Sequence, residues 1–162
     1  MVKKNIPNVV HAMWRGVLLV AGGLILSSAS EAKDMRVVLD LVVFNYLDRP
    51  IQAVNVDGAG YEVSGAYPET GKSTTVGFGF KLGPKTVTWR LDGPKGAPRN
   101  GEKVQNKNPL ELSRSQIVSG AKFLSVHIYP DDTVELITTV NFPHVSARWE
   151  AEIANRNARR GK

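Results

Sequence analysis

The chain has 162 residues, no cysteine and a formal net charge of +6 from 21 basic and 15 acidic side chains. The lack of cysteine excludes disulfides, thiolate metal sites, catalytic thiols and a lipid anchor on an acylated cysteine. Nucleic-acid-binding proteins gather lysine and arginine beside stacking aromatic residues, and this sequence has no such cluster, so we expect no nucleic-acid partner.

The first 32 residues are typical of a secretory signal peptide. An uncharged, apolar run over residues 16–26 is shorter than the roughly 20 residues of a membrane-spanning helix. Small residues follow it, with Ser30 and Ala32 at the positions expected before a cleavage site, and three basic residues precede it: Lys3, Lys4 and Arg15. We expect a periplasmic or secreted protein without stable membrane insertion after cleavage; an uncleaved membrane anchor is the alternative.

Cleavage after Ala32 leaves residues 33–162, a length typical of a single domain, and we predict one β-rich domain over this range. The removal of Lys3, Lys4, Arg15 and Glu31 with the leader lowers the net charge to +4. A charge this mild indicates solubility and weak steering of association.

Alternating apolar residues predict strands over residues 35–47 and 51–56, the second ending in an Asp57-Gly58 turn and returning over residues 61–63. One face of the first strand carries Val37, Leu39, Leu41 and Val43. After a loop over residues 64–71, a strand over residues 72–81 is predicted, with Val76, Phe78 and Phe80 on one side. Glycines inside this strand indicate a bulge or a close backbone approach.

A turn at residues 82–84 leads into a strand over residues 86–91, whose inward face carries Val87, Trp89 and Leu91. Trp89 is the predicted central aromatic residue of the core. Residues 109–117 fit either a short helix or an edge strand. Residues 121–140 then form a β-hairpin, which reverses at Pro130, Asp131, Asp132 and Thr133.

Residues 92–108 are predicted to form a long surface loop, because glycine, proline, asparagine and charged residues dominate them and cannot form a core. We expect this loop to bind an acidic partner surface through four basic residues, Lys95, Arg99, Lys103 and Lys107. An insertion without function is the alternative. The next candidate surface is the edge of the strand over residues 35–47, which we expect to be exposed and open to a strand added by a partner.

The chain ends in a predicted helix over residues 146–160, where Ser146 is the N-cap and basic residues near the end complement the helix dipole. Many short strands and one helix predict an all-β fold: a β-sandwich or partly open barrel of about seven strands with one short C-terminal helix. A parallel α/β sheet is disfavoured.

Motifs for catalysis and cofactors are absent from the sequence. Gly71-Lys72-Ser73 resembles the end of a phosphate-binding loop, but Ala66 replaces the required first glycine and no helix follows. His127 and His144, the histidines of the mature chain, show no metal-ligand spacing, so we predict neither a metal site nor a cofactor. His127 is expected on the polar face of its strand, paired with a neighbouring side chain.

Several segments together resemble a known group of proteins: residues 45–58, Val87-Thr88-Trp89, and the block from Val126 to Leu136. The chain resembles an uncharacterised family of Gram-negative envelope proteins, many of them lipoproteins. Some members are similar to immunity proteins encoded beside type VI secretion effectors, notably lipases. The resemblance covers most of residues 36–143 and implies a periplasmic binding role, although this chain lacks the cysteine of the lipoprotein form.

We therefore expect an exported periplasmic binding protein, with an immunity protein that neutralises a secreted toxin or lipase effector as the specific form. The alternatives are a small periplasmic hydrolase and a structural envelope protein with an unrecognised site. In a hydrolase, His127 is the one strand-borne candidate for the general base, because its ordinary pKa lies near neutral pH.

Overall fold

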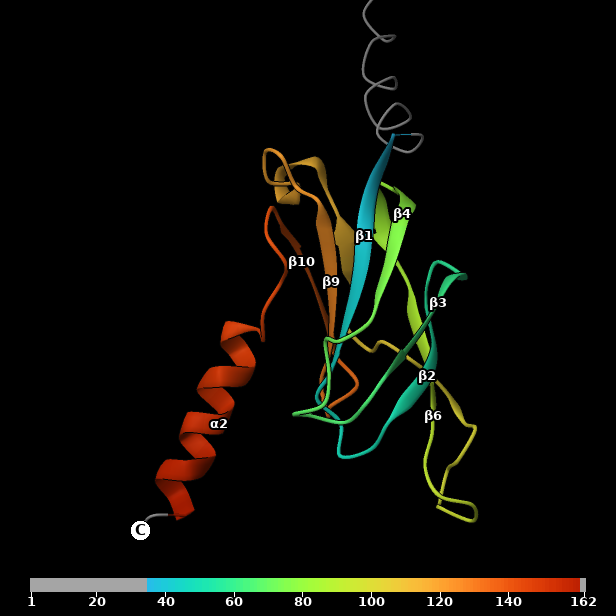
Figure 1. The fold of residues 1–162 in the computed structure, drawn as a ribbon, viewed down its shortest axis with the longest axis vertical. Helices are drawn as coiled ribbons and strands as arrows, with labels where there is room; N and C mark the ends of the chain where they lie inside the picture. The colour runs from blue at the N-terminus through green and yellow to red at the C-terminus, as the bar shows by residue number, and fades with distance from the viewer. Residues whose placement is uncertain (1–34, 161–162) are drawn as a thin grey trace, which may run out of the picture.

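The computed structural model describes residues 35–160, so the predicted signal peptide, residues 1–32, lies outside the described residues. Two four-stranded sheets enclose a common core (Figure 1). Sheet A has the order β10-β9-β1-β4 and comprises β1 (Arg36–Asn45), β4 (Thr74–Lys81), β9 (Phe123–Ile128) and β10 (Val134–Thr139). Sheet B has the order β3-β2-β6-β7 and comprises β2 (Ile51–Val56), β3 (Ala59–Ser64), β6 (Val87–Leu91) and β7 (Lys103–Gln105).

The predicted all-β, sandwich-like fold with one C-terminal helix, α2 (Ala147–Arg160), is confirmed for the described residues. Seven strands in this range have five or more residues, and β5 (Gly83–Lys85), β7 and β8 (Leu110–Leu112) have three each. β5 and β7 were not predicted, because three residues are too few to show alternation. β5 pairs with β8 where a turn was expected at residues 82–84, and β7 lies inside the predicted loop over residues 92–108.

The segment predicted as ambiguous, residues 109–117, contains both alternatives in succession. β8 is followed directly by a short 3-10 helix, η1 (Arg114–Gln116). Lys85, the last residue of β5, is buried, with its side chain only 2% exposed, and its ammonium bonds the Asp57 carboxylate at 2.9 Å. This ion pair ties β5 to the turn between β2 and β3.

β1 lies in the middle of sheet A, where it pairs antiparallel with β4 and parallel with β9. The prediction that its edge is free for an added strand is therefore wrong. Leu39, Leu41 and Val43 face sheet B, as predicted, while Val42 and Phe44 face the other way and are also buried. A sequence with apolar residues on both faces is what a central, doubly covered strand requires.

Trp89 lies at the centre of the core between the sheets, with no exposed surface. Its neighbours in the same cluster include Val87 and Leu91 from β6 and inward residues of β1 and β9. The prediction that Trp89 is the central aromatic residue is confirmed.

A bulge in β4 changes one predicted face. Leu39 pairs with Phe78, but Leu41 pairs with Thr75, so β4 contains one extra residue. Gly77 has a positive φ of 70° at this point, and its N–H donates to the Asp40 carboxylate at 2.8 Å. Val76 therefore leaves the side of Phe78 and Phe80 and is 77% exposed, in contrast to the prediction.

The predicted hairpin over residues 121–140 is confirmed as β9 and β10, with Leu124, Val126 and Ile128 in the core. The opposite face of β9 carries Ser125 and His127, as predicted, and both are fully buried. His127 pairs with the neighbouring Tyr46 side chain and stacks on Phe44, and Trp149 of α2 packs in the same aromatic cluster.

Helix α2 is attached to the domain only through its first turns. Ser146 caps it as predicted, accepting the Trp149 N–H on its hydroxyl at 3.2 Å. Trp149 is the one buried residue of the helix, and the C-terminal half projects away from the sheets (Figure 1). Among the described residues, no helix is long and apolar enough to cross a membrane.

Candidate functional site

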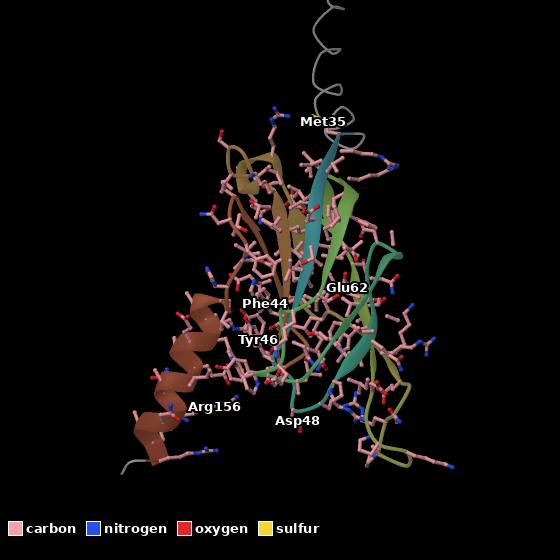
Figure 2. All side chains as sticks on the ribbon, viewed as in Figure 1. Met35, Phe44, Tyr46, Asp48, Glu62 and Arg156 are labelled. Atoms are coloured by element: carbon pink, nitrogen blue, oxygen red, sulfur yellow. The ribbon has the colours of Figure 1, made fainter. Side chains whose placement is uncertain are left out.

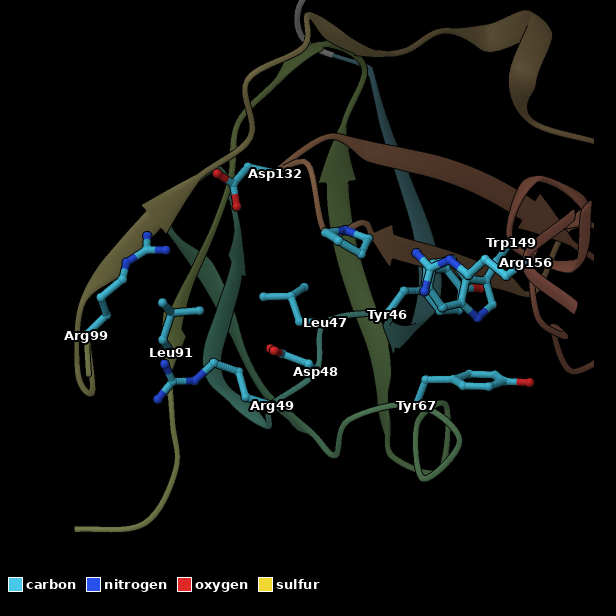
Figure 3. A pocket seen from close by; sticks show the side chains of 11 residues that line it. Tyr46, Leu47, Asp48, Arg49, Tyr67, Leu91, Arg99, Asp132, Trp149 and Arg156 are labelled. Atoms are coloured by element: carbon cyan, nitrogen blue, oxygen red, sulfur yellow. The ribbon is translucent and has the colours of Figure 1, made fainter. Parts of the chain in front are cut away.

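An open cleft of about 580 Å³ lies between α2, the corner after β1 and the loop after β6. Six of its eleven lining residues are tyrosine, tryptophan or arginine. The lining comprises Tyr46, Leu47, Asp48, Arg49, Tyr67, Leu91, Arg99, Pro130, Asp132, Trp149 and Arg156. Figure 3 shows Tyr46, Trp149 and Arg156 on one side, Arg49, Leu91 and Arg99 on the other, and Leu47 and Asp48 between them.

The floor of the cleft is a corner of the chain that Asn45 holds in shape. The Asn45 amide is fully buried and donates to the Arg49 carbonyl at 2.8 Å and to the Gly65 carbonyl at 3.1 Å. Its side-chain oxygen accepts the Leu47 N–H at 3.0 Å. A single asparagine thus satisfies the backbone groups of two loops at once, which fixes the positions of the side chains from Tyr46 to Arg49.

Arg49 attaches the loop after β6 to this corner. Its Nε donates to the Asp92 carbonyl at 2.8 Å and its Nη1 to the Pro98 carbonyl at 2.7 Å. Arg49 Nη2 lies so close to Gly93 that a Cβ there would approach it to 3.0 Å. The guanidinium therefore acts mainly as a brace that sets the width of the cleft.

The opposite wall is aromatic. The Trp149 indole stacks on the Tyr46 ring with centroids 4.7 Å apart, and the Tyr67 ring meets the indole edge-on at 5.7 Å. The Arg156 guanidinium lies 5.0 Å from the Trp149 ring and is paired with Glu152. Figure 2 places Phe44 and Tyr46 in the domain beside the start of α2, with Arg156 on the side of α2 that faces the domain.

Charges around the cleft are arranged as ion pairs at its rim. Arg99 pairs with Glu102 at 2.8 Å, and this guanidinium lowers the pKa of the Glu102 carboxyl. Lys107 pairs with Asp132 at 2.8 Å. Asp48, which points into the cleft in Figure 3, takes part in no ion pair among the described residues. The rim therefore presents cations and anions side by side.

The structure separates the four basic residues predicted to bind a partner. Arg99 lines the cleft, and Lys107 borders it through its ion pair with Asp132. Lys103 lies on β7 and lines a separate hollow of about 240 Å³ on sheet B. Lys95 is exposed in the turn before Ala97. The predicted loop is therefore not one surface, and two of its cations lie at the cleft.

A buried polar network lies behind the aromatic wall. His127 Nδ1 is 2.8 Å from the Tyr46 hydroxyl, and His127 Nε2 is 2.9 Å from the Ser125 hydroxyl. The Tyr46 oxygen accepts the Ser146 N–H at 2.9 Å. The Ser146 and Tyr129 hydroxyls are 2.6 Å apart, and Tyr129 donates to the Glu135 carboxylate at 2.7 Å. One chain of hydrogen bonds thus runs from β9 to the cap of α2.

The hydrogen-bond partners assign the protons of this network. Ser125 donates its hydroxyl to the Ile137 carbonyl at 3.1 Å, so it accepts from His127 Nε2. Tyr46 then donates to His127 Nδ1, which makes the imidazole a neutral Nε2–H tautomer. Burial lowers the pKa of His127 to about 4 and raises the pKa of Tyr46. His127 and Tyr46 are therefore neutral at neutral pH.

His127 cannot act as the general base considered for a hydrolase in this conformation. Neither its imidazole nor the Ser125 hydroxyl has any exposed surface, so a substrate has no path to them. Among residues 35–160, no cluster of histidine and acidic side chains has the geometry of a metal site.

Sequence reasoning missed the cleft and its aromatic wall. Leu47, Tyr67, Arg99 and Trp149 come from four segments spread over about a hundred residues, and nothing local links them. The one usable signal was Tyr46, which continues the outward face of β1 at Val42 and Phe44 and indicates that something covers that face.

Comparisons of the chain with protein-family models, with curated proteins and with solved structures find no match. The resemblance to Gram-negative envelope proteins therefore stays a prediction.

Proposed function

We propose that the protein is an exported binding protein of the cell envelope that recognises a partner protein through the cleft beside α2. In its specific form it is an immunity protein, and the partner is a secreted toxin or lipase effector that it occludes. The observation that carries the proposal is the composition of the cleft, where tyrosine, tryptophan and arginine form six of eleven lining residues.

These residue types support a protein-binding site because they dominate the energy of protein–protein interfaces. Tyr67 is 38% exposed and stands at the mouth of the cleft with its ring against Trp149. A cavity of about 580 Å³ is large enough for one or two side chains of a partner. The walls are braced by Asn45 and Arg49, so little order has to be created on binding.

Rim charges support the same proposal. Arg99 and Lys107 are held at the cleft by Glu102 and Asp132, and a partner can exchange these exposed ion pairs for its own. Pairs of this kind contribute little to stability but affect the rate and specificity of association. The predicted leader and the resemblance to immunity proteins support export and the class of partner.

A binding role is also favoured over a hydrolase by the state of the candidate base. His127 and Ser125 have no exposed surface, and the lining of the cleft contains no histidine or serine. A hydrolase that uses histidine or serine needs such a group within hydrogen-bond distance of its substrate.

The test is association of the purified protein with the product of a secreted effector gene next to its own. Tyr67→Ala and Arg156→Ser should each raise the dissociation constant by about tenfold or more, because they remove exposed contacts at the cleft. Arg99→Ser with Lys107→Ser should slow association and reduce its dependence on salt.

Lys103→Ser is the matched control, because it removes a cation from sheet B, away from the cleft. It should leave both rates unchanged. Equal affinities for all of these variants would remove the cleft from the interface. Turnover of an ester, glycan or peptide that His127→Ala abolishes would replace the binding role with an enzymatic one.

A further inference from the structure

Beyond the proposed function, the structure carries an inference about how α2 is held. We propose that the docking of α2 is gated by protonation: in acidic solution His127 takes up a proton and the start of α2 leaves sheet A, which removes one wall of the cleft. This device needs no partner protein and is tested on the protein alone.

The first step is that His127 connects to α2 through one residue. Tyr46 donates its hydroxyl to His127 Nδ1 and accepts the N–H of Ser146, the N-cap of α2. His127 Nδ1 accepts the Tyr46 hydroxyl proton, and the Ser146 side chain is the other neighbour of this hydroxyl. Protonation of His127 Nδ1 removes this acceptor, so the Tyr46 hydroxyl proton must point away from the imidazole.

The second step is that a charged imidazole has no compensation where it lies. The ring is stacked on Phe44 with centroids 4.7 Å apart and is completely covered. Burial of a charge without a partner is costly, and the low pKa of His127, about 4, reflects that cost.

The charged and titratable groups around His127 do not offset its charge. Glu135 is the cross-strand neighbour on β10, but its carboxylate bonds Tyr129 instead of the imidazole. The side chains that face this region from the other elements are Tyr46 from β1, Tyr129 after β9, Tyr67 from the loop before β4, and Arg148 and Glu150 from α2. Arg148 lies 3.7 Å above the Tyr129 ring and is a cation itself.

The third step is that α2 is the element that yields most easily. It is held to the sheets by side chains of its first turns: Ser146 through Tyr46 and Tyr129, Trp149 on the Tyr46 ring, and Arg148 through Asp131 at 3.0 Å. Residues 154–160 are all exposed. The strands of sheet A, in contrast, are joined by backbone ladders. The contacts of Ser146 and Trp149 with Tyr46, the residue that is bonded to His127, are therefore the ones that break at least cost.

The direction of the pH dependence follows from the pKa of His127 in the docked and in the released state. In the docked state the pKa of His127 is about 4, and once α2 leaves it returns towards the ordinary value of about 6.5. The released state therefore binds the proton more readily, and acid favours release. The effect is absent above about pH 6.5 and complete near pH 4, with the release equilibrium rising at most tenfold per pH unit.

The experiment is hydrogen exchange of the full-length protein between pH 7.5 and pH 4, expressed as protection factors. Protection of the α2 amides should fall by up to tenfold per pH unit below about pH 6.5. Protection of core amides, such as those of Leu41 and Val126, should persist. Equal loss of protection in α2 and in the core would mean global acid unfolding and would overturn the proposal, as would constant protection of α2.

Variants assign the effect to His127. His127→Asn keeps an acceptor for Tyr46 but does not titrate, so protection of α2 should become independent of pH, whatever its level. His144→Asn, an exposed histidine, should behave as the unmodified protein does. Glu135→Gln keeps an acceptor for Tyr129 and should also retain the transition. A transition that survives in His127→Asn, or that only Glu135→Gln abolishes, would contradict the assignment.

Tyr46→Phe is the second route if His127→Asn does not fold. It cuts the connection between His127 and Ser146, so α2 should already be less protected at pH 7.5 and should respond less to acid. Full protection of α2 at pH 7.5 in this variant would overturn the proposed connection.

Discussion

Two glycines near β1 differ in the space around them, and this difference decides what a methyl group does there. At Gly71, φ is +71° and a Cβ would lie 2.4 Å from the Phe44 ring. This ring is itself held in place because it stacks on His127. At Gly79 in β4, φ is not positive and a Cβ would meet nothing within 4 Å.

Gly71→Ala should therefore destabilise the protein by about 2 kcal/mol or more, because the methyl group clashes with Phe44 and the backbone conformation disfavours alanine. Gly79→Ala should change the free energy of unfolding by less than about 0.5 kcal/mol. Urea denaturation of both variants checks this, and similar values for the two would mean that the loop carrying Gly71 relaxes away from Phe44.

Trp89 is the residue on which the central core depends most. Trp89→Ala should cost about 3 to 5 kcal/mol, through lost burial and the cavity that remains. The control is Val76→Ala in the exposed bulge of β4, with an expected cost below about 0.5 kcal/mol. A cost below about 1 kcal/mol for Trp89→Ala in chemical denaturation would contradict its place at the centre of the core.

At the scale of elements, the ion pair between the buried Lys85 of β5 and the partly exposed Asp57 of the β2–β3 turn allows the effect of charge to be tested apart from that of shape. Asp57 binds Lys85 through one carboxylate oxygen and accepts the Thr86 N–H at 2.9 Å through the other. Asp57→Asn keeps the bond to Thr86 and tolerates the positive φ at this position, but it leaves the Lys85 ammonium buried without a counter-ion.

Asp57→Asn should thus destabilise the protein by about 3 kcal/mol, whereas Lys85→Met, which removes the buried charge, should cost less. Equilibrium denaturation of the two single variants and of the double variant gives the coupling between the sites. A smaller cost for Asp57→Asn than for Lys85→Met would mean that water reaches the ammonium in the variant.

The sequence predicted those strands in which apolar and polar residues alternate within the strand itself. Alternation over residues 35–47 and 121–140 identified β1, β9 and β10, and the inward faces were assigned correctly because apolar side chains line them. His127 lies on the polar face of β9 and pairs with the neighbouring Tyr46, as predicted, but its complete burial was not predicted. The aromatic cluster beside it includes Trp149 of a helix about twenty residues later, for which β9 holds no signal.

For the whole molecule, the fold class could be predicted but the cleft could not. Turn signals and short strands sufficed for an all-β sandwich, because that class depends on local patterns. The cleft depends on Asn45 and Arg49, two polar residues whose long-range bonds to Gly65, Asp92 and Pro98 set its shape. Bonds between loops have no periodicity, so only the structure brings Tyr67, Arg99 and Trp149 together.

The parallel pairing of β1 with β9 has a consequence for the protein during its synthesis. Asp40 pairs with Phe123, 83 residues later, so β1 must wait for β9 before both of its edges are hydrogen-bonded. At synthesis rates of about 5 to 20 residues per second, this edge of β1 stays unpaired for roughly 4 to 17 s. During that interval the nascent chain is a target for aggregation and for chaperones, and an export route that keeps it unfolded until it is released whole would suit its topology.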